Sequence, residues 1–165
     1  SSHQSMWDIP PISWYLRKNH PKFISKKELG KGIPSISYNL NHGGSILIDR
    51  RNPKQAIVEM LKFSKYLNEH NRSGVIFAEG TRSRTGTPKP FRRTGLETLF
   101  KKLPTAHVIP VTINNSWKLQ RYGLFPVPIG VKVEMIAHPA LKVSDFDNVE
   151  LIDKVEAIVK SKIHA

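Results

Sequence analysis

The stretch Val75-Ile76-Phe77-Ala78-Glu79-Gly80-Thr81-Arg82-Ser83-Arg84-Thr85-Gly86 changes character partway along its length. Its first three residues are apolar and favour a strand, whereas the glycines, hydroxyls and arginines that follow are typical of a loop. Glycine allows sharp backbone turns, and hydroxyl and guanidinium groups donate hydrogen bonds to anions. The stretch therefore predicts a strand that ends in an anion-binding loop. Taken alone, it fits a solvated surface turn equally well.

The composition indicates one folded domain. The chain has 165 residues, of which 39% are hydrophobic, and it contains no internal repeat or low-complexity tract. It is long enough to bury one sizeable core. Cysteine is absent, which excludes disulfides and cysteine-based catalysis or metal binding. No apolar run approaches the roughly 20 residues that span a bilayer as a helix.

The strongest global signal is a formal net charge of +13, with an isoelectric point near 10.1. Such a charge implies an anionic partner: nucleic acid, an anionic membrane surface, or an acidic protein or substrate. The basic residues are spread along the chain rather than gathered in one tail. We therefore expect a basic face on a folded domain.

Strand and helix patterns alternate along the chain, which predicts an α/β fold. Besides the strand that begins at Val75, the expected strands are residues 22–25, 107–113 and 131–138, and a buried strand that follows the glycine turn at Gly43 and Gly44 and ends before Arg50. Four helices are expected. The first begins near Pro10, and the second runs from Pro53 to about His70. The third runs from a capping box at Thr94 to about Lys102, and the fourth follows a cap at Asp147. Between the last two strands, Trp117, Tyr122 and Phe125 belong to a semi-apolar loop that would either contact lipid or cover the core.

His3 and Asp8, five residues apart, are candidates for acid–base chemistry. On a continuous helix such residues diverge by about 140°, but Pro10 disfavours helical angles at Ile9. We therefore expect the helix to start after Asp8, and a turn to bring its carboxylate to the His3 ring. That contact would leave the other ring nitrogen free to take a proton from a hydroxyl. The spacing alone is weak, and Asp8 would serve equally well as a helix cap.

Two further arginine positions favour anion binding. Arg50 follows the predicted strand after Gly43 and Gly44, at the end where α/β sheets usually meet their ligands. A solvated arginine at the end of a strand is the alternative. Arg92 and Arg93 precede the predicted helix at Thr94, close to a helix N-terminus, which attracts anions.

Four motifs together resemble the glycerolipid acyltransferases of the 1-acyl-sn-glycerol-3-phosphate (lysophosphatidate) acyltransferase type. They occur in the family's order and span nearly the whole chain. The four are His3-Gln4-Ser5-Met6-Trp7-Asp8, Ile46-Leu47-Ile48-Asp49-Arg50, Phe77-Ala78-Glu79-Gly80-Thr81-Arg82-Ser83 and Val108-Ile109-Pro110-Val111. The combination is far more specific than any one of them.

The resemblance implies transfer of a fatty acyl group from an acyl carrier protein or coenzyme A thioester to the free hydroxyl of a lysophosphatidate-like lipid. His3 would be the general base and Asp8 the residue that orients it. The acceptor's phosphate would bind at five residues: Arg50, Glu79, Gly80, Thr81 and Arg82. Pro110 would shape the acyl-donor region. Neither a metal nor a cofactor is implied.

The same resemblance implies a fold and a location. The fold is a mixed, largely parallel central sheet flanked by helices, in one acyltransferase catalytic domain of residues 1–165. Family members carry a strand, and often membrane-associated helices, before the first motif, and we expect this segment to be absent from the sequence given. The expected location is the cytoplasmic face of the cell membrane, with peripheral attachment or anchoring through that segment, and an anionic membrane surface is an expected partner.

Several alternatives stay open at this stage. Ser2 and Ala78 stand where the family usually has Asn and Pro, which would alter loop rigidity. Glu79 would either fix Arg82 or Arg50, or accept a hydrogen bond from the acceptor's glycerol, since a carboxylate repels phosphate. Another acceptor, such as glycerol 3-phosphate, a lysophospholipid or an aminolipid, would suit the same fold. A nucleic-acid-binding module is a remote alternative, because the chain lacks an aromatic-and-basic RNA signature, and we expect no nucleic-acid partner.

Overall fold

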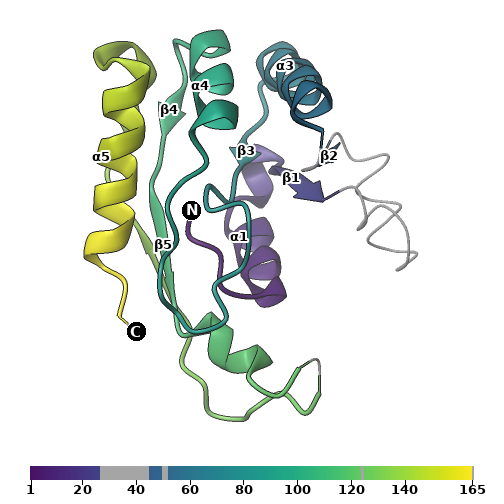
Figure 1. Ribbon diagram of the computed structural model, residues 1–165, viewed down its shortest axis with the longest axis vertical. Helices are drawn as coiled ribbons and strands as arrows, with labels where there is room; N and C mark the ends of the chain where they lie inside the picture. Colours follow the sequence, from purple (N-terminus) through teal and green to yellow (C-terminus); the bar gives the residue numbers. More distant parts are fainter. Residues whose placement is uncertain (27–44, 50–51, 124, 165) are drawn as a thin grey trace.

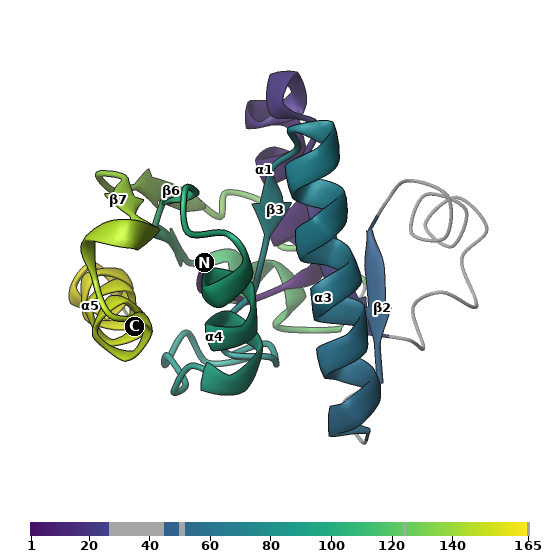
Figure 2. The ribbon, with the colours of Figure 1, turned by 90° about the horizontal axis from the view of Figure 1, so that it is seen from above.

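Helices cover both faces of a set of strands (Figure 1). The computed structural model describes residues 1–26, 45–49, 52–123 and 125–164. Three helices lie side by side on one face: α3 (Pro53–His70), α4 (Arg93–Lys102) and α5 (Asn148–Ser161). Helix α1 (Ile9–Tyr15) lies on the other face, as the view from above shows (Figure 2).

The strands pair in both directions. Strand β1 (Lys22–Lys26) lies between β2 (Ile46–Ile48) and β3 (Gly74–Val75) and is parallel to both, with Ile24 opposite Ile46 and Phe23 opposite Val75. Two antiparallel pairs complete the set: β5 (Val111–Asn114) with β6 (Glu134–Ala137), and β4 (His107–Val108) with β7 (Leu141–Lys142). Short 3-10 turns are η1 (Met6–Asp8), η2 (Arg17–Asn19), η4 (Ser116–Gln120) and η5 (Val143–Asp145). The predicted α/β fold with a parallel sheet and flanking helices is confirmed, and the antiparallel strands form two separate pairs.

Alternation along β1 builds a core on each side of the sheet, because successive side chains of a strand point to opposite faces. Phe23 packs toward α1, in a cluster with Ile12, Val75 and Ile113. Its neighbour Ile24 packs against the opposite cluster, under α3 and α4. That cluster contains Ile46, Met60, Phe63, Leu67 and Leu99.

The first two residues of the chain bridge the parallel strands and the antiparallel pair. The backbone of Ser1 hydrogen-bonds both Ile76, at 3.0 Å, and Ala78, at 3.3 Å. On the other side, the Ser2 amide donates to the Val111 carbonyl, and the Ser2 hydroxyl accepts from the Ile113 amide at 2.8 Å. This bridge places His3 next to the residues that follow β3.

Several expected strands are divided or shorter than predicted; the strand expected over residues 131–138, for example, covers only Glu134–Ala137. Pro110 divides the strand expected over residues 107–113, because proline has no N–H to donate to a strand partner. The Pro110 carbonyl accepts a hydrogen bond from the His138 amide at 2.9 Å. At this point the chain changes its strand partner from β7 to β6. Strand β3 ends at Val75, since the next residues bond Ser1 instead of β1. Strand β2 (Ile46–Ile48) lies within the strand expected between the glycine turn and Arg50, and the glycines and Arg50 themselves lie outside the described residues.

The helix caps agree with the sequence at two of three predicted positions. Asn52 accepts from the Gln55 amide at 3.0 Å, and Asp147 accepts from the Val149 amide at 3.0 Å. The capping box predicted at Thr94 is wrong. Helix α4 begins one residue earlier, because the extended Arg92 donates its N–H to the Ala78 carbonyl at 2.9 Å and the chain turns directly into the helix.

Replacement of Phe63 tests the core under α3. This side chain is 1% exposed, and Phe63→Ala should lower the free energy of unfolding by about 3–5 kcal/mol, because it leaves a cavity. Leu61→Ala on the same helix, at a position 37% exposed, is the control and should cost much less. Urea unfolding of both variants measures the difference. Equal losses in the two variants would contradict the assignment of the buried face.

Candidate active site

His3 and Asp8 meet as the sequence predicts. The distance between His3 Nδ1 and Asp8 Oδ2 is 2.9 Å. The turn η1 ends at Asp8 and α1 begins at Ile9, so the backbone bends between the two residues. The alternative role of Asp8 as a cap of α1 is wrong, since its side chain makes no cap hydrogen bond to that helix.

Asp8 is fully buried and accepts hydrogen bonds at both carboxylate oxygens. Oδ2 accepts from the backbone amides of Gln4, at 2.8 Å, and Ser5, at 3.0 Å, in addition to its contact with His3 Nδ1. Oδ1 accepts from the Ser116 hydroxyl in a short hydrogen bond. An ionised carboxylate has no proton of its own to donate. The proton between the two side chains is therefore assigned to Nδ1, with Nε2 as the basic nitrogen of a neutral ring.

Two serine hydroxyls form a chain of hydrogen bonds that ends at the Asp8 carboxylate. Ser116 gives its single hydroxyl proton to Asp8, so at 2.5 Å it accepts from the Ser5 hydroxyl. Ser5 in turn accepts from the Trp7 amide at 3.0 Å and caps η1. The Ser116 hydroxyl, which bonds the carboxylate, is thus directed by a second hydrogen bond, and this helps to fix the carboxylate's position.

The loop that follows β3 holds His3 in place. The His3 amide donates to Glu79 Oε1 at 3.2 Å, and its carbonyl accepts from the Ser83 amide at 2.8 Å. The imidazole stacks on the Phe77 ring, with ring centroids 4.0 Å apart and planes inclined by 22°. The stretch predicted to bind an anion and the His3–Asp8 pair therefore lie together.

Glu79 is buried and joins two backbone segments. Its second oxygen, Oε2, accepts from the Lys89 amide at 3.0 Å. Burial raises the pKa of Glu79 above its ordinary value, although the amide hydrogen bonds from Lys89 and His3 oppose the shift. The prediction that Glu79 fixes Arg82 is wrong, because Arg82 Nη1 donates to Gln120 Oε1 at 3.1 Å. The acceptor's glycerol as a partner of Glu79 stays a prediction.

Two glycines shape the loop as expected. Gly80 has φ of 69°, in the left-handed region that favours glycine, and the Arg92 side chain lies where a Cβ would be. Gly86 has φ of 82°, and an added Cβ would lie 2.6 Å from Trp117 Nε1. The two glycines are thus packed closely against neighbouring side chains, whereas Arg82, Arg84 and Thr85 of the same loop are exposed.

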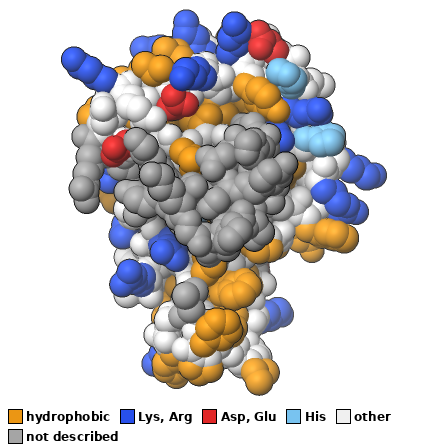
Figure 3. Space-filling view, turned by 90° about the vertical axis from the view of Figure 1, so that its right-hand side faces the viewer, with side chains coloured by type: hydrophobic (Ala, Val, Ile, Leu, Met, Phe, Trp, Pro, Cys, Tyr) orange, Lys and Arg blue, Asp and Glu red, His pale blue; other side chains and the backbone are white. Residues whose placement is uncertain are grey.

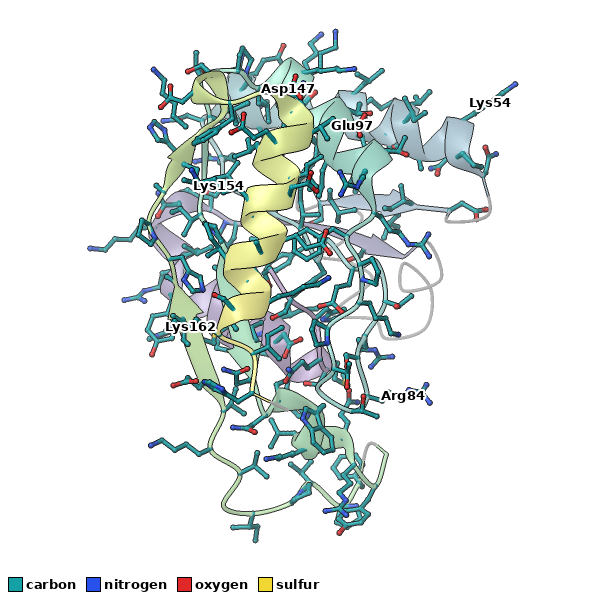
Figure 4. The ribbon with its side chains drawn as sticks, turned by 60° about the vertical axis from the view of Figure 1, so that its left-hand side comes forward. Lys54, Arg84, Glu97, Asp147, Lys154 and Lys162 are labelled. Atoms are coloured by element: carbon teal, nitrogen blue, oxygen red, sulfur yellow. The ribbon has the colours of Figure 1, made fainter. Side chains whose placement is uncertain are left out.

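Three exposed cations border the site. Arg82, Arg84 and Lys89 line an open depression of about 360 Å³, together with Ser83, Thr85, Thr87 and Pro88. Lys89 Nζ donates to Thr81 Oγ1 at 3.1 Å and to the Arg82 carbonyl at 3.0 Å, which braces the loop. Arg84 points away from the fold (Figure 4). Among the described residues, no carboxylate forms an ion pair with these cations, so their charge is available to an anion.

The remaining predicted site residues differ in position. Thr81 lies in the loop, half-buried beside the three cations. Pro110 is fully buried between β4 and β5, and its link to the acyl donor stays a prediction. Arg50 lies outside the described residues.

Sequence reasoning missed Ser116, Gln120 and Lys89. Ser116 and Gln120 are more than 100 residues from the η1 turn that they bond, so no local spacing pattern identifies them. Lys89 lies within the basic stretch, but only the bend of the loop brings it back to Thr81.

Comparisons with known proteins agree on one family. The Acyltransferase family model matches residues 1–114. A 1-acyl-sn-glycerol-3-phosphate acyltransferase of Helicobacter pylori is 38% identical over 130 residues, which are 73% of this chain and 52% of that protein. The protein of the same name from Limnanthes douglasii is 34% identical over 161 residues, 97% of this chain and 54% of the other. The chain spans about half the length of these curated relatives.

A solved structure is also similar. The crystal structure of the 1-acyl-sn-glycerophosphate acyltransferase PlsC from Thermotoga maritima superposes with a TM-score of 0.71 at 27% sequence identity. The match covers 97% of this chain and 61% of the other chain. The two proteins therefore share their fold over nearly all of the present sequence.

The raised pKa of Glu79 predicts a pH-dependent contribution to stability. Between the ordinary and raised pKa the folded state binds more protons than the unfolded state, so the free energy of unfolding falls as pH rises through that window. Glu79→Gln removes this slope. Urea unfolding of both proteins from pH 4 upward, with Glu150→Gln as an exposed reference, measures the difference. A wild-type stability that rises relative to Glu79→Gln over this window would contradict the sign.

Proposed function

The chain belongs to the Acyltransferase family, and we propose that it transfers a fatty acyl group from an acyl thioester to the free hydroxyl of 1-acylglycerol 3-phosphate, making phosphatidate. The names of its relatives support this acceptor. The observation that carries the chemistry is the 2.9 Å contact between His3 Nδ1 and the buried Asp8 carboxylate.

His3 acts as the general base and Asp8 orients it. With Nδ1–H held by Asp8, Nε2 takes the proton of the acceptor hydroxyl as the oxygen attacks the thioester carbonyl. Asp8 stabilises the imidazolium that forms. When the carbon–sulfur bond breaks, the imidazolium returns this proton to the departing thiolate, which leaves as a thiol. The proposed reaction uses neither metal nor cofactor.

The cations beside His3 bind the acceptor's phosphate. Arg82 and Lys89 approach it as charge-assisted donors, and Thr81 adds a hydroxyl. Glu79 keeps these donors at a fixed distance from the base, because it bonds the backbones of both His3 and Lys89. This arrangement would hold a phosphate on one side of Nε2 while the glycerol hydroxyl reaches it.

The donor and the membrane are anionic partners of the same surface. Both acyl coenzyme A and an acylated acyl carrier protein carry negative charge, which a chain of net charge +13 attracts. An anionic membrane would supply the lipid acceptor at the cytoplasmic face, where acyl thioesters are available. Across the described part of the chain, no helix has the length and hydropathy needed to cross a bilayer.

Loss of the proposed base should abolish turnover. His3→Ala in the full protein should reduce acyl transfer from an acyl thioester to lysophosphatidate by about 10³-fold or more, because no other group occupies its position. His70→Ala, at the exposed end of α3, is the matched control and should retain wild-type turnover. Circular dichroism checks that both variants fold. Near wild-type turnover of folded His3→Ala would refute the mechanism.

Loss of a phosphate-binding cation should change acceptor affinity. Arg82→Gln should raise KM for lysophosphatidate by about 10- to 100-fold, as expected for one charge-assisted hydrogen bond, and should change kcat less. Arg17→Gln is the control, since Arg17 lies before β1, away from the carboxyl ends of the parallel strands.

A panel of acceptors with and without a phosphate completes this test. Monoacylglycerol, which lacks the phosphate, should be used poorly by the wild type and should show little further loss with Arg82→Gln. An equal loss for both acceptors would contradict phosphate binding at Arg82. If the protein prefers glycerol 3-phosphate, the proposed mechanism still holds, but the acceptor is glycerol 3-phosphate and not lysophosphatidate.

A further inference from the structure

A loop between η4 and β6 projects from one end of the molecule and exposes apolar side chains. We call its described residues, 121–123 and 125–132, the apolar loop. Tyr122 is 62% exposed, Phe125 is 81% exposed and Ile129 is fully exposed. Figure 3 shows hydrophobic side chains gathered at this lower end of the molecule. Large apolar side chains grouped in this way mark an interaction surface rather than a covering for the core.

The space around the loop is open. A Cβ added at Gly123 or Gly130 would meet no atom within 4 Å. The three exposed apolar residues belong to none of the core clusters. Covering the core, one of the two roles left open by the sequence, therefore does not explain them.

Three basic residues lie in or beside the apolar loop, and the first carboxylate after it is Glu134, at the start of β6. Lys118, Arg121 and Lys132 are exposed, and the sequence from Asn115 to Val133 contains no Asp or Glu. None of the three forms an ion pair with a described carboxylate. An apolar tip with cations at its base matches an anionic bilayer, where acyl chains lie beneath negatively charged headgroups.

We propose that the apolar loop inserts its tip, Tyr122, Phe125 and Ile129, into the surface of an anionic phospholipid bilayer, while Arg121 and Lys132 contact the headgroups. Tyrosine suits this depth, because its ring is apolar and its hydroxyl stays in contact with water.

The apolar loop directly follows residues that bond the candidate active site. Gln120, the residue before it, accepts from the Met6 amide at 3.1 Å and from Arg82. Ser116, at the start of η4, donates to Asp8. Because η4 joins the loop to both halves of the site, insertion of the tip would hold His3 close to the bilayer surface. This consequence rests on the proposed function, whereas insertion itself does not.

A probe at the tip tests insertion directly. The 165 residues contain no cysteine, so Ile129→Cys gives one labelling position within them, once any cysteine elsewhere in the full protein is replaced by serine. Labelled with an environment-sensitive dye, it should show a blue shift and quenching by lipid-attached quenchers when phosphatidylglycerol vesicles are added. Val149→Cys, 46% exposed at the start of α5, is the control and should show neither. No change at position 129, with or without vesicle binding by the protein, would overturn the proposal.

A loop variant separates insertion from catalysis. Phe125→Ser/Ile129→Ser should reduce turnover of vesicle-bound lysophosphatidate at least about tenfold, as expected from the lost apolar transfer energy. Turnover of a short-chain, monomeric acceptor should stay unchanged, and Val149→Ser should affect neither. If the wild type transfers no acyl group but the probe inserts, the proposed function fails and the loop assignment holds. Equal loss with both acceptors would overturn the loop's role.

Self-association is the rival outcome for the same surface. Sedimentation velocity without lipid should show that wild type and Phe125→Ser/Ile129→Ser have the same oligomeric state. A wild-type dimer that the double variant loses would assign the apolar loop to a contact between two copies of the chain, and would overturn the membrane assignment.

Discussion

The buried Asp8 carboxylate is the interaction on which the site depends. A buried charge is stable only where hydrogen bonds replace the water it has lost. Two backbone amides, the Ser116 hydroxyl and the His3 ring supply them. Their directions fix the carboxylate, and the carboxylate fixes the orientation of the imidazole. The same contacts tie η1 to η4, so the local order of the first residues depends on a segment more than 100 residues away in the sequence.

The sheet brings the two halves of the site together. Residues 1 and 2 lie between the extension of β3 and strand β5 and bond both. The chain therefore delivers His3 beside the loop that follows β3, where Glu79 and Ser83 bond its backbone. The carboxyl ends of parallel strands are the usual ligand-binding edge of an α/β sheet. In this fold that edge carries the His3 imidazole, the buried Asp8 carboxylate and exposed cations within one connected network.

Much of this arrangement could be predicted from the sequence, and the failures have physical reasons. Periodicity and caps identified α3 and α5, and Pro10 correctly indicated that Asp8 turns back toward His3. The break in the strand at Pro110 and the early start of α4 depend on backbone hydrogen bonds to residues distant in the sequence, which no local pattern identifies. The role of Glu79 could not be predicted either, because its partners are backbone amides, which leave no signal in a sequence.

The tautomer of His3 is the central claim of this account, since only a ring with its proton on Nδ1 presents Nε2 as the base. Nitrogen-15 NMR of the full protein with labelled histidine, at a pH where the ring is neutral, distinguishes the two tautomers. We predict that His3 Nδ1 carries the proton, that Nε2 gives the chemical shift of an unprotonated nitrogen, and that Asp8→Asn disturbs this pattern. A neutral His3 with its proton on Nε2 would contradict it.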